Sequence, residues 1–196
     1  MKNEDNRSAI LESALAMALK FHAGQTRSKG DSVGLPYVVH PIEVMKTVCD
    51  WGIRDLNVLV AAVLHDSLED TQLDPRKIEE QFGSTVRVMV EELTFLPIVD
   101  EDAARRSQRK AEYLAEFHMR SPGALVIKVA DRFCNTWDFV RDEPTYAAAY
   151  YKKASHLLDA FGARAVELAE RFGKTVPLRV AEAKKRLEMA LIALRV

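Results

Sequence analysis

The stretch NVLVAAVLHDSLED at residues 57–70 begins with apolar residues and ends in a cluster of charged side chains. Its first part, Val58 to Leu64, is apolar on every side of a helix, which predicts a helix that is buried on most sides. An imidazole and three carboxylates then follow within two turns of the chain. Burying ionised carboxylates without partners costs several kcal/mol, so we expect a cation to balance this cluster. A solvated helix end is the alternative for this segment taken alone.

Helical periodicity continues through nearly all of the sequence. The loop TRSKGDSVGLPY at residues 26–37 is too polar for a helix and has room for one short β-hairpin near residues 27–39. Further helices are expected near residues 8–22, 41–51, 75–82, 84–93, 100–119, 124–140, 145–161, 163–172 and 177–195. No repeat or linker divides the chain. The sequence therefore predicts a single all-α domain over residues 1–196, with about 8–10 helices.

The composition restricts the class of function. The 196 residues are 48% hydrophobic and 29% charged, and the formal net charge of −1 does not favour a general nucleic-acid binder. Two cysteines do not suggest a disulfide scaffold. The polar N-terminus and the lack of a long apolar run predict a cytoplasmic protein that does not contact membranes. We expect a small-molecule partner, and the sequence leaves the oligomeric state open.

A second buried acid is expected in LVIKVADR at residues 125–132, where Asp131 interrupts an apolar run. An ion pair with Lys128 or Arg132 would also explain it. His40 stands immediately before Pro41 at an expected helix start, where a capping or packing role is the structural alternative.

Taken together, these residues indicate a metal site. Two imidazoles, His40 and His65, and two carboxylates, Asp66 and Asp131, form a mixed nitrogen and oxygen ligand set suited to Mn²⁺, Fe²⁺ or Zn²⁺. A site of this kind with an open position can lower the pKa of a bound water enough to make a nucleophile near neutral pH.

Four blocks of the sequence resemble the hydrolase domain of the RelA/SpoT homologues, a branch of the HD superfamily. They are HAGQTRSKGDSVGLPYVVHP at residues 22–41, AAVLHDSLEDT at 61–71, FGSTVRVMVEELT at 82–94 and KVADRFCN at 128–135. The blocks keep the order and spacing of the family, and the resemblance covers roughly residues 8–160. The chain is most similar to the stand-alone small alarmone hydrolases.

The resemblance implies an HD-type helical fold with one Mn²⁺ per chain, for which another divalent transition metal could substitute. The implied ligands are His40, His65, Asp66 and Asp131. The implied reaction is hydrolysis of the 3′-pyrophosphate of guanosine tetra- or pentaphosphate, (p)ppGpp, to GDP or GTP and pyrophosphate. A single metal also agrees with the histidine count, because His118 is the only histidine between the HD pair and Asp131.

The remaining site residues have distinct implied roles. Glu69 and Asp70 match the pair that positions and activates the attacking water, whereas Arg27 and Asn135 match residues that contact the substrate. An arginine suits phosphate because its planar fork donates two parallel hydrogen bonds. Lys29 could add charge on the same loop, although a solvated turn is the better explanation of Lys29 taken alone.

The substrate stays open at this stage. The chain departs from the family at Phe95–Ile98 and at Thr145–Ala149, where some members carry polar or basic residues near the substrate. A related HD phosphatase acting on another nucleotide, such as NADPH at its 2′-phosphate or a nucleoside phosphate, is the enzymatic alternative. An inactive nucleotide-binding module is the non-enzymatic one, and retention of all the site residues argues against it.

Overall fold

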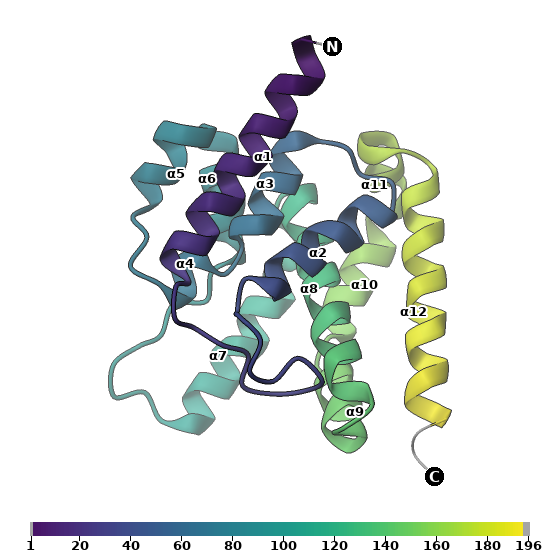
Figure 1. Ribbon diagram of the computed structural model, residues 1–196. Helices are drawn as coiled ribbons and strands as arrows, with labels where there is room; N and C mark the ends of the chain where they lie inside the picture. Colours follow the sequence, from purple (N-terminus) through teal and green to yellow (C-terminus); the bar gives the residue numbers. More distant parts are fainter. Residues whose placement is uncertain (1, 194–196) are drawn as a thin grey trace.

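The computed structural model describes residues 2–193, which form twelve α-helices and one short 3₁₀-helix (Figure 1). In chain order these are α1 (Lys2–Phe21), α2 (Val39–Asp50), α3 (Leu56–Leu64), α4 (Ser67–Asp70), α5 (Pro75–Phe82), α6 (Ser84–Leu93), α7 (Ala103–Ala115), η1 (Glu116–His118), α8 (Pro122–Val140), α9 (Pro144–Lys152), α10 (Ser155–Ala163), α11 (Ala165–Phe172) and α12 (Thr175–Ala193).

Helix α3 lies at the centre of the arrangement. It packs against α1, α2, α6 and α8, and each of its residues from Val58 to Leu64 is buried. Helix α8 is the second buried element, with α2 and α9 against it, while α12 runs along the outer side of α8, α9 and α11 (Figure 1). Asp55 caps α3 by accepting a hydrogen bond from the backbone N–H of Asn57. The two apolar runs of the sequence therefore form adjoining core helices, and both carry charged residues toward the same region.

The prediction of an all-α fold is confirmed. The helices outnumber the expected 8–10 because two predicted helices are each divided, at residues 65–66 and at 153–154. None of the helices within residues 2–193 is long and apolar enough to cross a membrane. The cytoplasmic location stays a prediction.

The first division changes the expected geometry of the charged cluster. The sequence pattern predicts one helix through Asp70, but α3 ends at Leu64 and α4 begins only at Ser67. Consecutive residues on a regular helix point about 100° apart. At this junction the side chains of His65 and Asp66 instead converge, with Nε2 of His65 3.0 Å from Oδ2 of Asp66. The break is thus what allows two neighbours in sequence to face one point.

The short hairpin that the sequence allowed near residues 27–39 does not form. Within the described residues this segment contains turns and one isolated antiparallel bridge, between Thr26 and Pro36. Proline has no N–H to extend a ladder, and Gly30 and Gly34 adopt positive φ angles of 76° and 81°. The loop is held by side-chain contacts to α8 rather than by strand pairing.

The burial of α3 gives a test of the fold. Leu64 is 0% exposed in the centre of the core, whereas Leu178 on α12 is 71% exposed. We expect Leu64→Ala to lower the free energy of unfolding by about 2–5 kcal/mol, because it removes buried methyl groups and leaves a cavity. The matched variant Leu178→Ala should change it by less than about 0.5 kcal/mol. Urea unfolding followed by circular dichroism measures both, and equal losses would contradict the placement of α3.

Candidate metal centre and active site

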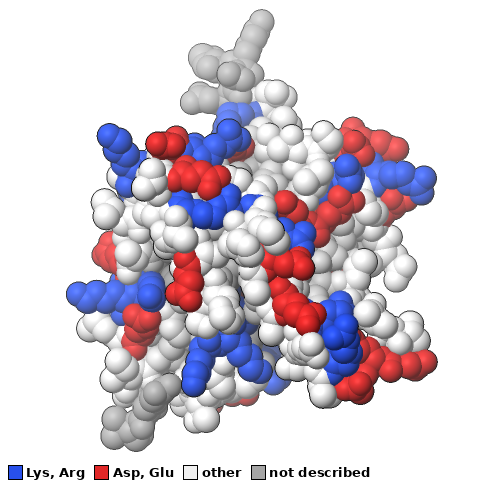
Figure 2. Space-filling model, turned by 180° about the vertical axis from the view of Figure 1, so that it is seen from behind, with Lys and Arg blue, Asp and Glu red and all other residues white. Residues whose placement is uncertain are grey.

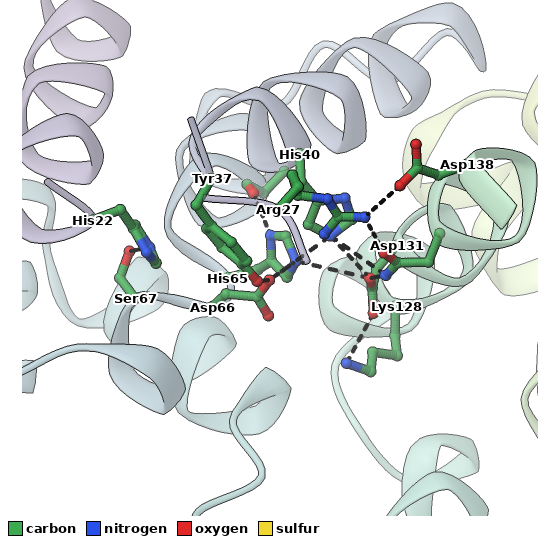
Figure 3. Close-up of polar contacts among 12 residues, drawn as sticks. His22, Arg27, Tyr37, His40, His65, Asp66, Ser67, Lys128, Asp131 and Asp138 are labelled. Carbon is green, nitrogen blue, oxygen red and sulfur yellow. Dashed lines mark hydrogen bonds and ion pairs between the residues drawn. The ribbon is translucent and has the colours of Figure 1, made fainter. Parts of the chain in front are cut away.

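Side chains from three helical segments meet at one buried point (Figure 3). His40 comes from the first turn of α2, His65 and Asp66 from the junction of α3 and α4, and Asp131 from the middle of α8. Nε2 of His40 lies 3.2 Å from Oδ1 of Asp131 and 3.7 Å from Oδ2 of Asp66. Nε2 of His65 lies 4.0 Å from Oδ1 of Asp131. The four residues that the sequence singled out as metal ligands are therefore brought together.

These separations fit a shared metal ion. Ligand atoms about 2.1 Å from one ion lie roughly 3–4 Å from one another when they occupy neighbouring positions around it. His40, His65 and Asp131 each offer a ligand atom, and these atoms all lie within 4.8 Å of one another. Asp66 adds a fourth ligand atom, its carboxylate oxygen Oδ2, beside them.

The orientation of the His65 ring also fits a metal-binding role. Its Nδ1 lies 2.9 Å from the carbonyl oxygen of Ala62, which can only accept, so Nδ1 carries the proton. Nε2 is therefore the nitrogen that faces the site, where it is buried and makes no hydrogen bond among the described residues, and it would bind a metal ion that displaces its proton. A backbone carbonyl that fixes the far nitrogen in this way is the usual support for a metal-binding histidine.

The electrostatics of the site favour added positive charge. Burial alone would lower the pKa of His65, but the adjacent Asp66 carboxylate raises it to about 9. Burial would likewise raise the pKa of Asp131, yet the Lys128 ammonium and the contact with His40 hold it well below its usual range. Both carboxyl groups thus stay ionised in a buried place, which is the condition that a divalent cation relieves.

Two side chains hold Asp131 in position. Nζ of Lys128, one helical turn earlier on α8, lies 3.0 Å from Oδ2 of Asp131. Asn135, one turn later, donates its Nδ2 hydrogen to Oδ1. The ion pair that the sequence offered as the alternative for Asp131 therefore exists with Lys128, and it leaves Oδ1 turned toward the histidines.

Asp66 has its own support, which the sequence reasoning missed. The hydroxyl of Tyr37 donates to Oδ2 of Asp66 across 2.6 Å, and the Tyr37 ring stacks on His22 with centroids 4.8 Å apart. His22 is fixed in turn by Gln25 and Ser67. Tyr37 lies three residues before His40 in the first sequence block, and this spacing could have indicated that Tyr37 lies near the metal ligands.

Glu69 and Asp70 lie on the short helix α4, beside the four converging residues. Oε2 of Glu69 accepts the backbone N–H of Phe95 at 2.9 Å, which orients the carboxyl group. Burial raises the pKa of Glu69. Partial burial, followed by repulsion from Asp66, raises the pKa of Asp70. Both groups are consequently better proton acceptors than ordinary surface carboxylates.

Arg27 and Asn135, both expected near the substrate, contact each other directly. Nη2 of Arg27 donates to Oδ1 of Asn135 at 2.8 Å and to Oδ2 of Asp138 at 3.1 Å. Asp138 also accepts hydrogen bonds from the backbone N–H and the hydroxyl of Ser32. It is the residue that docks the loop onto α8, and it lies seven positions beyond Asp131 on the same face of the helix. Lys29 instead places Nζ 4.2 Å from the ring centroid of Tyr146 on α9.

Comparison with known proteins gives two kinds of relative. The sequence pattern of a family described as HD domain matches residues 14–139. A mouse protein named guanosine-3′,5′-bis(diphosphate) 3′-pyrophosphohydrolase MESH1 is 37% identical over 141 residues, covering 71% of this chain and 75% of the mouse protein. Its human counterpart is 36% identical over 140 residues, covering 71% and 74%. A probable GTP pyrophosphokinase of Mycobacterium leprae is 36% identical over 127 residues, which are 65% of this chain and 15% of that longer protein.

A solved structure supports the same relationship. A metazoan orthologue of SpoT, described as hydrolysing ppGpp and acting in starvation responses, superposes with a TM-score of 0.69 and 26% sequence identity. The superposition covers 91% of this chain and 95% of that one. The protein lmo0812 of Listeria monocytogenes, with a TM-score of 0.51 and 23% identity, shares the fold.

Substitutions in the loop at residues 26–37 can test its contact with α8. A Cβ atom on Gly30 would lie 2.5 Å from the backbone oxygen of Asp138, whereas one on Gly34 would have nothing within 4 Å. Both glycines have positive φ, so each alanine variant should lose about 1–2 kcal/mol of unfolding free energy from backbone strain. We expect Gly30→Ala to lose clearly more in urea unfolding, because the loop must move away from α8. Equal losses for Gly30→Ala and Gly34→Ala would show that the loop is not clamped there.

Proposed function

Because this chain belongs to the HD domain family, we propose that it is a metal-dependent hydrolase that removes the 3′-pyrophosphate of (p)ppGpp. The names of its relatives support the substrate, since both the mouse and human proteins are 3′-pyrophosphohydrolases. The observation that carries the proposal is the convergence of His40, His65, Asp66 and Asp131 beside Glu69 and Asp70. Residues 1–196 act in this proposal as one hydrolase domain.

The proposed cofactor is one Mn²⁺ per chain. His40, His65, Asp66 and Asp131 would hold it, and their mixed nitrogen and oxygen donors also suit Fe²⁺ or Zn²⁺. Bound there, a divalent metal supplies Lewis acidity for the phosphate and makes a neighbouring water more acidic.

The protein's own groups then carry the proton and the orientation. In the hydrolysis, the oxygen of a water forms a bond to the phosphorus attached to the ribose 3′ oxygen, and the bond between that phosphorus and the 3′ oxygen breaks. The water proton passes to the Glu69 and Asp70 pair, whose raised pKa values suit them to accept it. The 3′ oxygen takes up a proton as it leaves, so the products are GDP or GTP and pyrophosphate.

Substrate binding is proposed on the Asn135 side of the centre. Arg27 and Asn135 form a joined pair at the loop, with Arg27 as a donor for a phosphate and Asn135 as a polar contact near the ribose. Lys29 is proposed as a weaker contributor, because its ammonium faces the Tyr146 ring on the exposed part of the loop.

A substrate panel tests the proposed function directly. The protein loaded with Mn²⁺ should convert ppGpp to GDP and pyrophosphate, resolved by anion-exchange chromatography, and should leave NADPH and simple nucleoside monophosphates largely intact. His65→Ala, prepared in parallel, controls for contaminating phosphatases. Phosphate release from NADPH while ppGpp survives would replace the proposed substrate. Failure to turn over any nucleotide or to retain metal would favour a binding module.

The division between metal ligands and water-activating residues predicts two different defects. Asp131→Asn should lose bound manganese together with activity, because it removes a ligand. Glu69→Gln should keep the metal and lower kcat by about 10²- to 10⁴-fold, the usual loss for a general base. Elemental analysis of the dialysed proteins and steady-state rates on ppGpp measure the two. Wild-type metal content in Asp131→Asn would remove Asp131 from the ligand set, and a near-normal rate for Glu69→Gln would make its role structural.

A further inference from the structure

The part of α8 around Asp131 carries several polar side chains on one face of a largely buried helix. Lys128, Asp131, Arg132 and Asn135 recur at the spacing that aligns residues along a helix. Asn135 extends from Asp131 toward the loop and contacts Arg27. Lys128 and Arg132 occupy the other flank of Asp131, which faces α7 and α9. The centre thus has two flanks, and the proposed function uses only the first.

Arg132 is the unusual residue on the second flank. It is 3% exposed, its Nε atom has no hydrogen-bond partner, and no carboxylate among residues 6–193 forms an ion pair with it. Its guanidinium carbon lies 4.1 Å from the ring centroid of Tyr150 on α9. Arg27, by contrast, is engaged by Ser32, Asn135 and Asp138. A buried guanidinium with unused donors is costly for a fold and is suited to an anion that arrives from outside.

Two lysines belong to the same flank. Nζ of Lys128 lies 5.7 Å from the ring centroid of Tyr113 on α7, and the same atom forms the ion pair with Asp131. Lys110 precedes Tyr113 by one turn of α7 and stands at the solvent side, with Nζ 5.6 Å from the Phe95 ring. Partial burial and then repulsion from Lys128 lower the pKa of Lys110, and Arg132 adds to that repulsion. Three cations are therefore close enough to repel one another.

Three carboxylates act on this flank, since Lys128 is influenced by Asp131 and, from further away, by Asp66 and Glu69. Oε2 of Glu69 accepts the N–H of Phe95. On the face that Figure 2 presents, basic and acidic side chains are interspersed. Within residues 6–193, Asp131, Asp66 and Glu69 form no ion pair with Arg132, so its charge stays available for an anion beside the metal ligands.

We propose that Arg132, with Lys128 and Lys110, binds the distal phosphate of the substrate's 3′-pyrophosphate, on the flank of Asp131 opposite Arg27 and Asn135. This inference rests on the proposed function for the identity of the substrate. It assigns the two halves of the molecule to two flanks, with the reacting phosphorus between them. Arg132 then contributes planar donors at the inner end, Lys128 adds charge from its buried position beside Asp131, and Lys110 adds charge at the solvent side.

The test compares two ligands that differ only in the distal phosphate. They are ppGpp and guanosine 5′-diphosphate 3′-monophosphate, the second measured as a substrate or, where it is not turned over, by its inhibition constant. Arg132→Met keeps the apolar stem of the side chain beside Tyr150 and removes the donors. We expect it to weaken kcat/KM for ppGpp by about 10- to 100-fold, the range for a lost hydrogen bond between charged groups. The value for the 3′-monophosphate should stay within about 3-fold of wild type, which is less than about 0.7 kcal/mol.

Two further variants separate binding from packing. Arg132→Lys restores the charge and should recover part of the preference for the 3′-diphosphate. Arg87→Met removes another partly buried arginine, one that is paired with Glu79 of α5 and Glu91 of α6, and it should leave the values for both ligands unchanged. Melting temperatures of all variants are recorded beside the kinetics. Equal losses on both ligands in Arg132→Met would overturn the proposal and make Arg132 a packing residue for α9.

A second measurement keeps this inference separate from the proposed function. Calorimetric titration with methylenediphosphonate, with manganese in excess over protein and ligand, reports on a diphosphate pocket without any turnover. The wild type is expected to bind this probe about tenfold more tightly than Arg132→Met does. If it does so but fails to hydrolyse ppGpp, the diphosphate pocket stands and only the assignment of ppGpp as the substrate is wrong. Equal affinity in the two proteins overturns the pocket itself.

Discussion

The buried carboxylate of Asp131 is the charge around which the two core helices are arranged. It lies in the middle of α8, where the neighbouring residues are apolar, and ionised groups in such places need partners on several sides. Lys128 and Asn135 supply them from the same helix, and His40 supplies one from α2. This arrangement fixes how α2 sits on α8, because the imidazole must reach Asp131 from the first turn of α2. The positions of the metal ligands and the packing of α2 on α8 therefore depend on each other.

The break between α3 and α4 also helps to bring metal ligands together at Asp131. A continuous helix would turn His65 and Asp66 in directions about 100° apart, and only one of them could face Asp131. Ending α3 at Leu64 keeps the buried apolar segment intact and frees the next two residues to converge. Helix α4 begins directly after the break, and the backbone N–H of Asp70 donates to the carbonyl of its N-cap residue Asp66.

The sequence predicted the residue types at the centre but not how they are presented. His40, His65, Asp66 and Asp131 stand out because each is a metal-binding residue type at a place where an apolar helix leaves charge unexplained. The break at residues 65–66 could not be predicted, because HDSLED continues the helical pattern. Asp138 and Arg132 were missed for a different reason: their roles depend on Ser32 and Tyr150, which lie far away in the sequence and approach α8 only in the folded chain.

Residue types can be recognised in the sequence, whereas contacts between distant segments cannot. This difference explains why the reaction is easier to infer than the substrate. A metal centre with two carboxylates beside it can act on any reachable phosphoester, so its residues indicate hydrolysis and little more. Selectivity comes from the flanks, where the groups belong to separate helices. Judged from Thr145–Ala149 alone, the chain has few cations for a highly charged nucleotide. The folded chain places Lys110, Lys128 and Arg132 beside the centre from α7 and α8 instead. A missing arginine in one family position is then no measure of the charge that a substrate meets, because another helix can present an equivalent group to the same phosphate.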